Sequence, residues 1–237
     1  MHPQNKSAAE KAHGCGTQKG TAQTRQCPET GELMKPRWLF FDYDSTLIDE
    51  TAARLHGLAD CLREAGITQE QFAEKRAEFA GKTHDAEGEA IRFFGLPALP
   101  PHPEDETPYP ETEEVVRTLY ARGYDLGVVA NSPAGLEKRL ASWGLLQYFR
   151  TVIASGEIGV AKPNHAILLY SLQTAGVSPA HCVIIGDSLE DDIYPAVAMG
   201  IHTVWVRRTA RAGQLRTNGK QPDHVIPDLN GLLELYQ

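Results

Sequence analysis

Acidic, basic and hydroxyl side chains follow several of the apolar runs in this 237-residue chain. The set comprises Asp42, Asp44 and Thr46, then Asn131 and Ser132, then Lys162, and last Asp187 with Asp192. Several carboxylates that converge without a cation repel one another, and a hard divalent ion such as Mg²⁺ removes that repulsion and also binds phosphate. A lysine suits phosphate as a point charge, and hydroxyl and amide donors complete an anion site. Because a carboxylate fixed in this way can attack phosphorus, the residue types indicate phosphoryl transfer through an aspartyl-phosphate.

Apolar runs of strand length precede these groups. The clearest runs are 37–41, 126–130, 182–185 and 203–206, with a weaker one at 151–153. Helical patterns lie between the runs, and each ends near a glycine, which is a common helix terminator. Continuously apolar strands that alternate with helices predict a parallel sheet covered on both faces. We therefore expect a doubly wound α/β domain, in which functional groups meet at the carboxyl ends of the strands.

A stretch of about sixty residues, 48–107, interrupts this alternation. Three helical patterns, at 55–65, 68–79 and 86–94, precede a proline-rich segment, and they predict a small all-helical unit. The predicted organisation is an α/β core formed by 34–47 and 108–237, with the helical unit inserted after the first strand.

The N-terminal segment, residues 1–33, is polar and has no hydrophobic period, so we expect a disordered leader. It lacks the apolar region of a secretory signal, and no run approaches the roughly 18 apolar residues of a spanning helix. The expected location is therefore the cytoplasm. The four cysteines form no CxxC pair; a Cys15–Cys27 disulfide is conceivable, and four free thiols are the preferred interpretation.

Charge limits the partners. Lys and Arg number 23 against 31 Asp and Glu, which gives a net charge of −8. Nucleic acids and anionic membranes require clustered positive charge, so neither is expected as a partner. A small anionic molecule held by a few local donors fits better, and the expected partner is a small-molecule phosphate ester. The oligomeric state is left open between monomer and homodimer.

Four short motifs together resemble the haloacid dehalogenase (HAD) superfamily. They are Asp-x-Asp-x-Thr at 42–46, Asn-Ser at 131–132, Lys-Pro at 162–163, and Gly-Asp-Ser-x-x-x-Asp at 186–192. The resemblance covers nearly all of 35–237 and implies a Rossmann-like core with a helical cap, which closes over substrate and excludes water. It favours the phosphatase-like branch of the family.

The resemblance also implies a role for each motif residue. Asp42 would be the nucleophile and a Mg²⁺ ligand. Asp44 would be the general acid and base, and its backbone carbonyl would reach the metal. Lys162 would neutralise the nucleophile and the phosphate. The remaining roles are loop support and substrate contact by Thr46, phosphate binding by Asn131 and Ser132, and metal binding by Asp187 and Asp192.

The sequence departs from the family pattern at two positions. Ser45 stands where the family usually has glycine, and we expect a serine to be tolerated there if the backbone does not need a positive φ. Ala130 stands where a Ser or Thr usually follows the second strand, so Asn131, Ser132 or a backbone N–H must supply the donor.

Several functions share these motifs. The leading hypothesis is a Mg²⁺-dependent phosphatase. A phosphosugar mutase would keep the same residues. A 2-haloacid dehalogenase resembles this sequence but lacks the second acid, which is present here as Asp44. A non-catalytic binding module on the same fold is the alternative from another class, because a fold does not guarantee a function.

Overall fold

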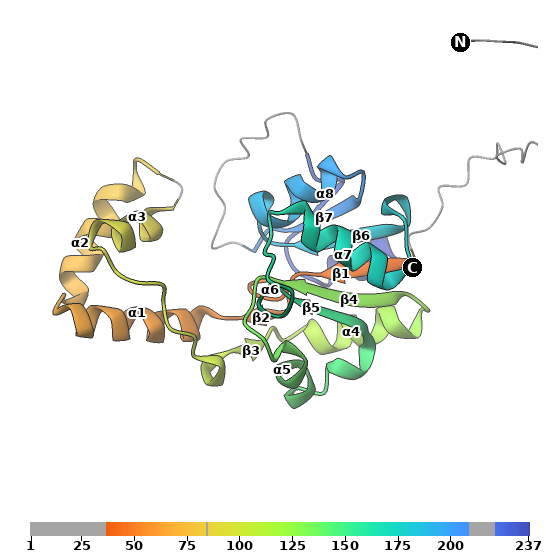
Figure 1. The fold of residues 1–237 in the computed structure, drawn as a ribbon, viewed down its shortest axis with the longest axis horizontal. Coiled ribbons are helices and arrows are strands. Elements are labelled where there is room, and N and C mark those ends of the chain that lie inside the picture. Colours follow the sequence, from red (N-terminus) through yellow and green to blue (C-terminus); the bar gives the residue numbers. More distant parts are fainter. Residues whose placement is uncertain (1–36, 84, 209–220) are drawn as a thin grey trace, which may run out of the picture. The chain divides into compact units, whose positions relative to one another are not determined.

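The computed structural model describes residues 37–83, 85–208 and 221–237. Its centre is a six-stranded sheet in the order β5-β4-β1-β6-β7-β8, with every neighbouring pair parallel. The strands are β1 (Trp38–Phe41), β4 (Asp125–Ala130), β5 (Phe149–Ala154), β6 (Cys182–Gly186), β7 (His202–Val206) and β8 (His224–Ile226). The doubly wound parallel sheet predicted from the sequence is thereby confirmed (Figure 1).

Helices cover both faces of this sheet because alternate residues of each strand point to opposite faces. Leu39 and Phe41 pack in one core cluster with buried residues of α4 (Thr112–Ala121), α5 (Leu136–Ser142) and α9 (Gly231–Leu235). Trp38 and Phe40 pack in a second cluster with α7 (His165–Ala175) and α8 (Tyr194–Ala198). Burial on both faces explains why the strands read as continuous apolar runs.

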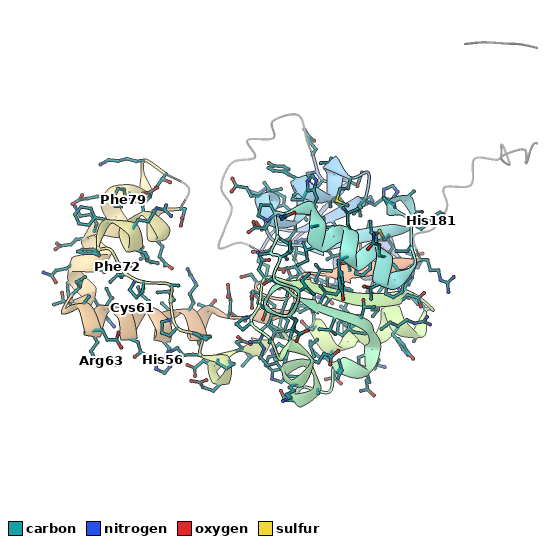
Figure 2. The ribbon with its side chains drawn as sticks, viewed as in Figure 1. His56, Cys61, Arg63, Phe72, Phe79 and His181 are labelled. Carbon is teal, nitrogen blue, oxygen red and sulfur yellow. The ribbon has the colours of Figure 1, made fainter. Side chains whose placement is uncertain are left out.

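A helical insert leaves the sheet after β1 and returns before α4. It contains α1 (Thr51–Ala65), α2 (Gln69–Ala80) and α3 (Ala86–Phe93), and it is bracketed by a short antiparallel pair, β2 (Ile48–Asp49) and β3 (Thr107–Pro108). Its own apolar cluster is formed by Leu58, Leu62, Phe72 and Ala90. In Figure 2 the labels place Phe72 and Phe79 on α2 and His56, Cys61 and Arg63 on α1. The predicted capping box opens α2, because Thr68 accepts from the Gln71 N–H and Gln71 accepts from the Thr68 N–H.

Among the described residues, the strands and α-helices not expected from the sequence are β2, β3, β8, α9 and the four-residue α6 (Ser155–Ile158). Each has five residues or fewer, too short for a hydrophobic period to be visible. The remaining short segments are a π-helical turn at Leu189–Ile193, and 3₁₀ turns at Pro103–Asp105, Leu146–Tyr148 and Pro179–His181.

Cys61 and Cys182 are buried free thiols, as expected. The predicted leader and the conceivable Cys15–Cys27 disulfide lie outside the described residues. Within the described ranges, the search for a helix of the length and apolarity that a membrane crossing requires found none.

Candidate active site

Asp42 begins the loop that follows the central strand β1. Its N–H donates to the Ile185 carbonyl of β6 at 2.8 Å, which continues the pairing of the two strands by one step. The carboxyl group is buried, and its Oδ2 accepts from the hydroxyl of Thr46 at 3.2 Å. The loop therefore holds Asp42 from both its main chain and its side chain, and the hydroxyl of the fully buried Thr46 is directed at this aspartate.

Lys162 lies between two of the predicted acidic residues. Its Nζ is 2.5 Å from Asp42 Oδ1 and 2.7 Å from Asp192 Oδ1, and all three side chains are buried. Burial alone would lower the pKa of Lys162, but the two carboxylates outweigh it and raise the pKa above its ordinary value. The lysine is therefore held as a cation.

For Asp192 the surroundings favour the uncharged form of the side chain. Burial, with the nearby Asp42 carboxylate, raises the pKa of Asp192 although Lys162 acts against this. Its Oδ2 also accepts from the Ser188 N–H at 3.1 Å. One lysine is thus shared by two buried acids, so this pair of carboxylates still favours a further cation.

Asn131 is directed at the loop that carries the lysine. Its Nδ2 donates to the Lys162 carbonyl at 2.9 Å, and the Lys162 N–H donates to Asn131 Oδ1 at 2.7 Å. The side-chain amide thus reproduces a strand-like pair of bonds with the main chain of Lys162. This contact explains how residues 31 positions apart are brought together, and a contact with phosphate remains a prediction for Asn131.

Asp44 differs from Asp42 in its surroundings. Burial is the largest cause that raises its pKa, followed by the charges of Glu50, Asp42 and Glu106, while Arg139 acts in the lowering direction; the result is a pKa of about 8. A carboxyl group of this kind carries a proton at neutral pH, which is the state a general acid needs.

Ser45 adopts a φ of +58°, in the left-handed region. The condition under which a serine is tolerated at this position is therefore not met, and the geometry explains why glycine suits it. The serine hydroxyl donates to Glu50 Oε1 at 3.2 Å, and the Ser45 N–H donates to the Ile48 carbonyl at 2.8 Å. These bonds hold the turn against a conformational cost of about 1–2 kcal/mol.

Ser132 is buried and is hydrogen-bonded to a residue outside the four sequence motifs. Its Oγ accepts from Nη2 of Arg139, one helix turn into α5. The guanidinium also lies over the Tyr43 ring at 5.3 Å and 3.8 Å from Glu106 Oε1. Sequence reasoning missed Arg139, Glu106 and Glu50, because only tertiary contacts bring them to the motif residues.

A cavity of about 190 Å³ brings most of the predicted residues together. Its lining consists of Asp42, Asp44, Ser45, Glu50, Asn131, Lys162, Asp187, Ser188, Asp191 and Asp192. Ser132 lines a neighbouring cavity of about 260 Å³, which it shares with Asp44 and Arg139. Asp44 therefore borders both spaces, and its role as general acid and base remains a prediction.

Three carboxylates in the first cavity are arranged to hold a metal ion. One oxygen from each of Asp42, Asp187 and Asp192 lies within 4.8 Å of the others. The donors are all oxygens and carry more negative charge than Lys162 offsets, which matches the preference of Mg²⁺. The donor chemistry thus fits a hard divalent cation.

Comparison with known proteins identifies the family of the chain. A model of the haloacid dehalogenase-like hydrolase family matches residues 36–200. A phosphoserine phosphatase of Thermus thermophilus is 33% identical over 122 residues, covering 51% of this chain and 48% of that protein. A phosphoglycolate phosphatase of Pseudomonas putida is 27% identical over 216 residues, covering 84% of this chain and 79% of that protein. The crystal structure of a HAD phosphatase from Thermococcus onnurineus has a TM-score of 0.62 and 28% identity, covering 85% of this chain and 97% of that one.

The family match extends over more than half of the chain. The protein therefore belongs to the haloacid dehalogenase-like hydrolases, as its motifs indicate. The chain spans about half the length of the first two curated relatives it matches.

Proposed function

We propose that this protein is a Mg²⁺-dependent phosphatase that hydrolyses a small-molecule phosphomonoester through a phosphorylated Asp42. The observation that carries the proposal is the pairing of Asp42 with Lys162 Nζ at 2.5 Å, two residues before a carboxyl group whose pKa is raised to about 8. A carboxylate nucleophile paired with a lysine, beside a protonated acid, is the combination that the first half-reaction requires. The proton that Asp44 gives up in that step leaves the carboxylate that acts as the base in the second.

In the first half-reaction, a carboxylate oxygen of Asp42 attacks phosphorus and the bond to the ester oxygen breaks. Asp44 gives its proton to that oxygen, which leaves as an alcohol. In the second, the Asp44 carboxylate takes a proton from water as the water attacks the phosphorus of the aspartyl-phosphate. Phosphate leaves, and both carboxyl groups return to their initial states.

Other residues position and neutralise these groups. Lys162 offsets the charge of Asp42 and of the phosphoryl oxygens, and Thr46 and Asn131 hold the nucleophile and the lysine loop. Asp42, Asp187 and Asp192, with the Asp44 backbone carbonyl, would hold the metal. A bound Mg²⁺ supplies charge neutralisation for the phosphoryl group in the transition state.

The helical insert has a role in this proposal. We assign 48–107 as a cap that closes over the substrate and excludes water, and 34–47 with 108–237 as the catalytic core. The support is the course of the chain, which leaves the sheet directly after the Asp42 loop and returns at β3. The cytoplasmic location and the monomeric or homodimeric state also remain predictions.

Phosphate release tests the proposal. The substrates are p-nitrophenyl phosphate and a panel of metabolite phosphates that includes phosphoserine and phosphoglycolate, which the names of the relatives suggest. We expect release with Mg²⁺, none with EDTA, and none from Asp42→Asn. Glu190→Gln is the matched control, because Glu190 is an exposed acid on the loop that carries Asp192.

The other outcomes favour the alternatives. Interconversion of sugar phosphates without net phosphate release would indicate a mutase, and chloride release from 2-haloacids would indicate a dehalogenase. Binding of Mg²⁺ with no turnover of any ester would favour a binding module. More than a few per cent of wild-type activity in Asp42→Asn would contradict Asp42 as the nucleophile.

A further inference from the structure

Arg139 connects three parts of the site that are distant in sequence. One guanidinium nitrogen donates to Ser132 Oγ, another lies 3.8 Å from Glu106 Oε1, and the group covers the ring of Tyr43, which stands between the two catalytic aspartates. Its side chain is only 19% exposed. An arginine buried to this degree is held in one orientation, and its contacts therefore define a fixed geometry at Ser132.

The bond from Arg139 determines what Ser132 can do. A serine hydroxyl has one proton and two lone pairs, and an arginine only donates. Because an N–H of Arg139 occupies one lone pair, the hydroxyl proton of Ser132 cannot point at the guanidinium. It points away from Arg139, and the adjacent cation makes that O–H a stronger donor.

The main chain of Ser132 is fixed as well. Its N–H donates to Ser155 Oγ at 3.1 Å, and its carbonyl accepts from the Gly156 N–H at 2.9 Å. Among the described contacts, the hydroxyl is therefore the donor group of Ser132 whose proton has no acceptor yet. The side chain lines the cavity that Asp44 also borders.

The other positions of the same loop offer less to a phosphate. Ala130 has no side-chain donor, and the amide of Asn131 is bonded on both sides to the main chain of Lys162. In the described part of the loop, Ser132 thus supplies the hydroxyl that Ala130 lacks.

Arg139 is itself anchored from the helical insert. Glu106, on the segment that returns from the insert, accepts from the Tyr43 hydroxyl at 2.9 Å and pairs with Arg139. The arginine therefore has a fixed carboxylate on one side and Ser132 on the other.

We propose that Arg139 is a positioning residue that fixes the Ser132 hydroxyl as a hydrogen-bond donor to the transferring phosphoryl group. The inference rests on the proposed phosphatase function. It assigns to a helix residue outside the four motifs the task of replacing the donor missing at position 130.

A double-mutant cycle tests the proposal. Arg139→Met, Ser132→Ala and the double variant are compared with wild type for kcat and KM on the best ester and for inhibition by inorganic phosphate. Loss of one oriented donor to a transition-state oxygen typically costs about 10²–10³-fold in kcat. We expect Ser132→Ala and Arg139→Met each to lower kcat/KM by about 10–100-fold, and the double variant to be no slower than Ser132→Ala alone.

Two further variants separate positioning from structure. Arg139→Lys keeps a charged N–H donor and should regain most of the lost activity. If Arg139→Met does not fold, Arg139→Ala, which also removes the donor, takes its place in the cycle. Lys138→Met removes a positive charge from an exposed position of the same helix and should leave kinetics and phosphate inhibition unchanged.

Losses that multiply in the double variant, or wild-type kinetics in Arg139→Met, would overturn the proposal. Failure of the proposed function looks different, because the wild-type protein would then release no phosphate from any ester.

Discussion

Asp42 and Asp44 are the same residue type two positions apart, and their surroundings give them different chemistry. Asp42 is paired with Lys162, whereas Asp44 is buried beside Glu50 and Glu106 and has a pKa raised to about 8. The sequence motif predicts both residues. The motif does not predict the raised pKa of Asp44, because Glu50 and Glu106 reach this residue only in the folded chain.

The dependence of kcat on pH should reflect the protonation of Asp44. Burial and the charges of Glu50 and Glu106 raise the pKa of Asp44. With saturating Mg²⁺, we therefore expect kcat to fall at alkaline pH, because deprotonated Asp44 cannot protonate the leaving oxygen. Asp44→Asn should lose this limb and about 10²–10⁴-fold in kcat on an alkyl phosphate. A pH–rate profile of both proteins checks this, and an unchanged limb in the variant would show that another group titrates.

Ser45 offers a test of backbone strain. Ser45→Ala and Ser45→Gly both remove the hydroxyl that donates to Glu50, and only glycine relieves the φ of +58°. We expect Ser45→Gly to be more stable than Ser45→Ala by about 1 kcal/mol in urea denaturation. Equal stabilities would mean that this turn relaxes without cost.

At the scale of elements, the sequence predicts the long periodic segments and misses the short ones. The apolar runs predict the β1, β4, β6 and β7 strands, because burial on both faces leaves a continuous signal. The weaker run at 151–153 predicts β5, an edge strand that is partly exposed. The three-residue β8 carries no such signal and pairs because β7 offers it an edge. In the same way, the motif residues of the site are predictable from the sequence. Arg139 and Glu106 are not, because the packing of α5 and of the segment that returns from the insert brings them to the site.

The end of β6 depends on a glycine. A Cβ on Gly186 would overlap the carboxyl group of Asp192, which is bonded to Lys162. Gly186→Ala should therefore displace Asp192, lower the free energy of unfolding by about 1–3 kcal/mol and reduce kcat. Gly81→Ala is the control, because its Cβ meets no atom within 4 Å and should change stability by less than about 0.5 kcal/mol. A fully active Gly186→Ala would contradict the need for this close approach.

A histidine pair joins the two ends of the insert. His56 of α1 stacks on His102 at 3.7 Å between ring centroids and 11° between planes, and carboxylates accompany both rings. These groups lie close enough to hold a metal, but the lone pairs of parallel rings lie in parallel planes and do not converge on one ion. A protonated His102 between Glu104 and Asp60 accounts for the contacts.

Stability should therefore depend on pH through His102. Hydrogen bonding to Glu104 outweighs burial and, with Asp60, raises its pKa above the ordinary 6.5. The stabilisation is complete below 6.5 and is lost as the pH rises through the higher pKa of the folded state. We expect His102→Gln to destabilise the protein more at about pH 6 than at about pH 9 in urea titrations, whereas the exposed His165→Gln should show no such trend. An equal loss at both pH values would rule out the imidazolium.

At the scale of the whole molecule, the site concentrates acid within an already acidic chain of net charge −8. Asp42, Asp187 and Asp192 are held together by the ends of β1 and β6. Folding brings these like charges together, and their repulsion lowers the stability of the folded protein until a cation binds.

Magnesium should accordingly raise the melting temperature. At about 100 times its dissociation constant the ion adds about 2.7 kcal/mol, or about 5–10 °C for a domain of this size. Asp187→Asn should show a smaller shift, and NaCl of equal ionic strength should not reproduce it. The same shift in the variant as in the wild-type protein would place the ion elsewhere.

The central strand of the sheet is also its first in the chain. β1 pairs with β4 and with β6, so one of its edges has no partner until residues up to Ile185 have been made. At about 5–20 residues per second, translation of that stretch takes on the order of ten seconds. During this interval the nascent polypeptide carries the apolar segment Trp38–Phe41 with an open edge, a hazard for aggregation on the ribosome. The strand that leads to Asp42 thus has both of its edges paired only after most of the sheet has been synthesised.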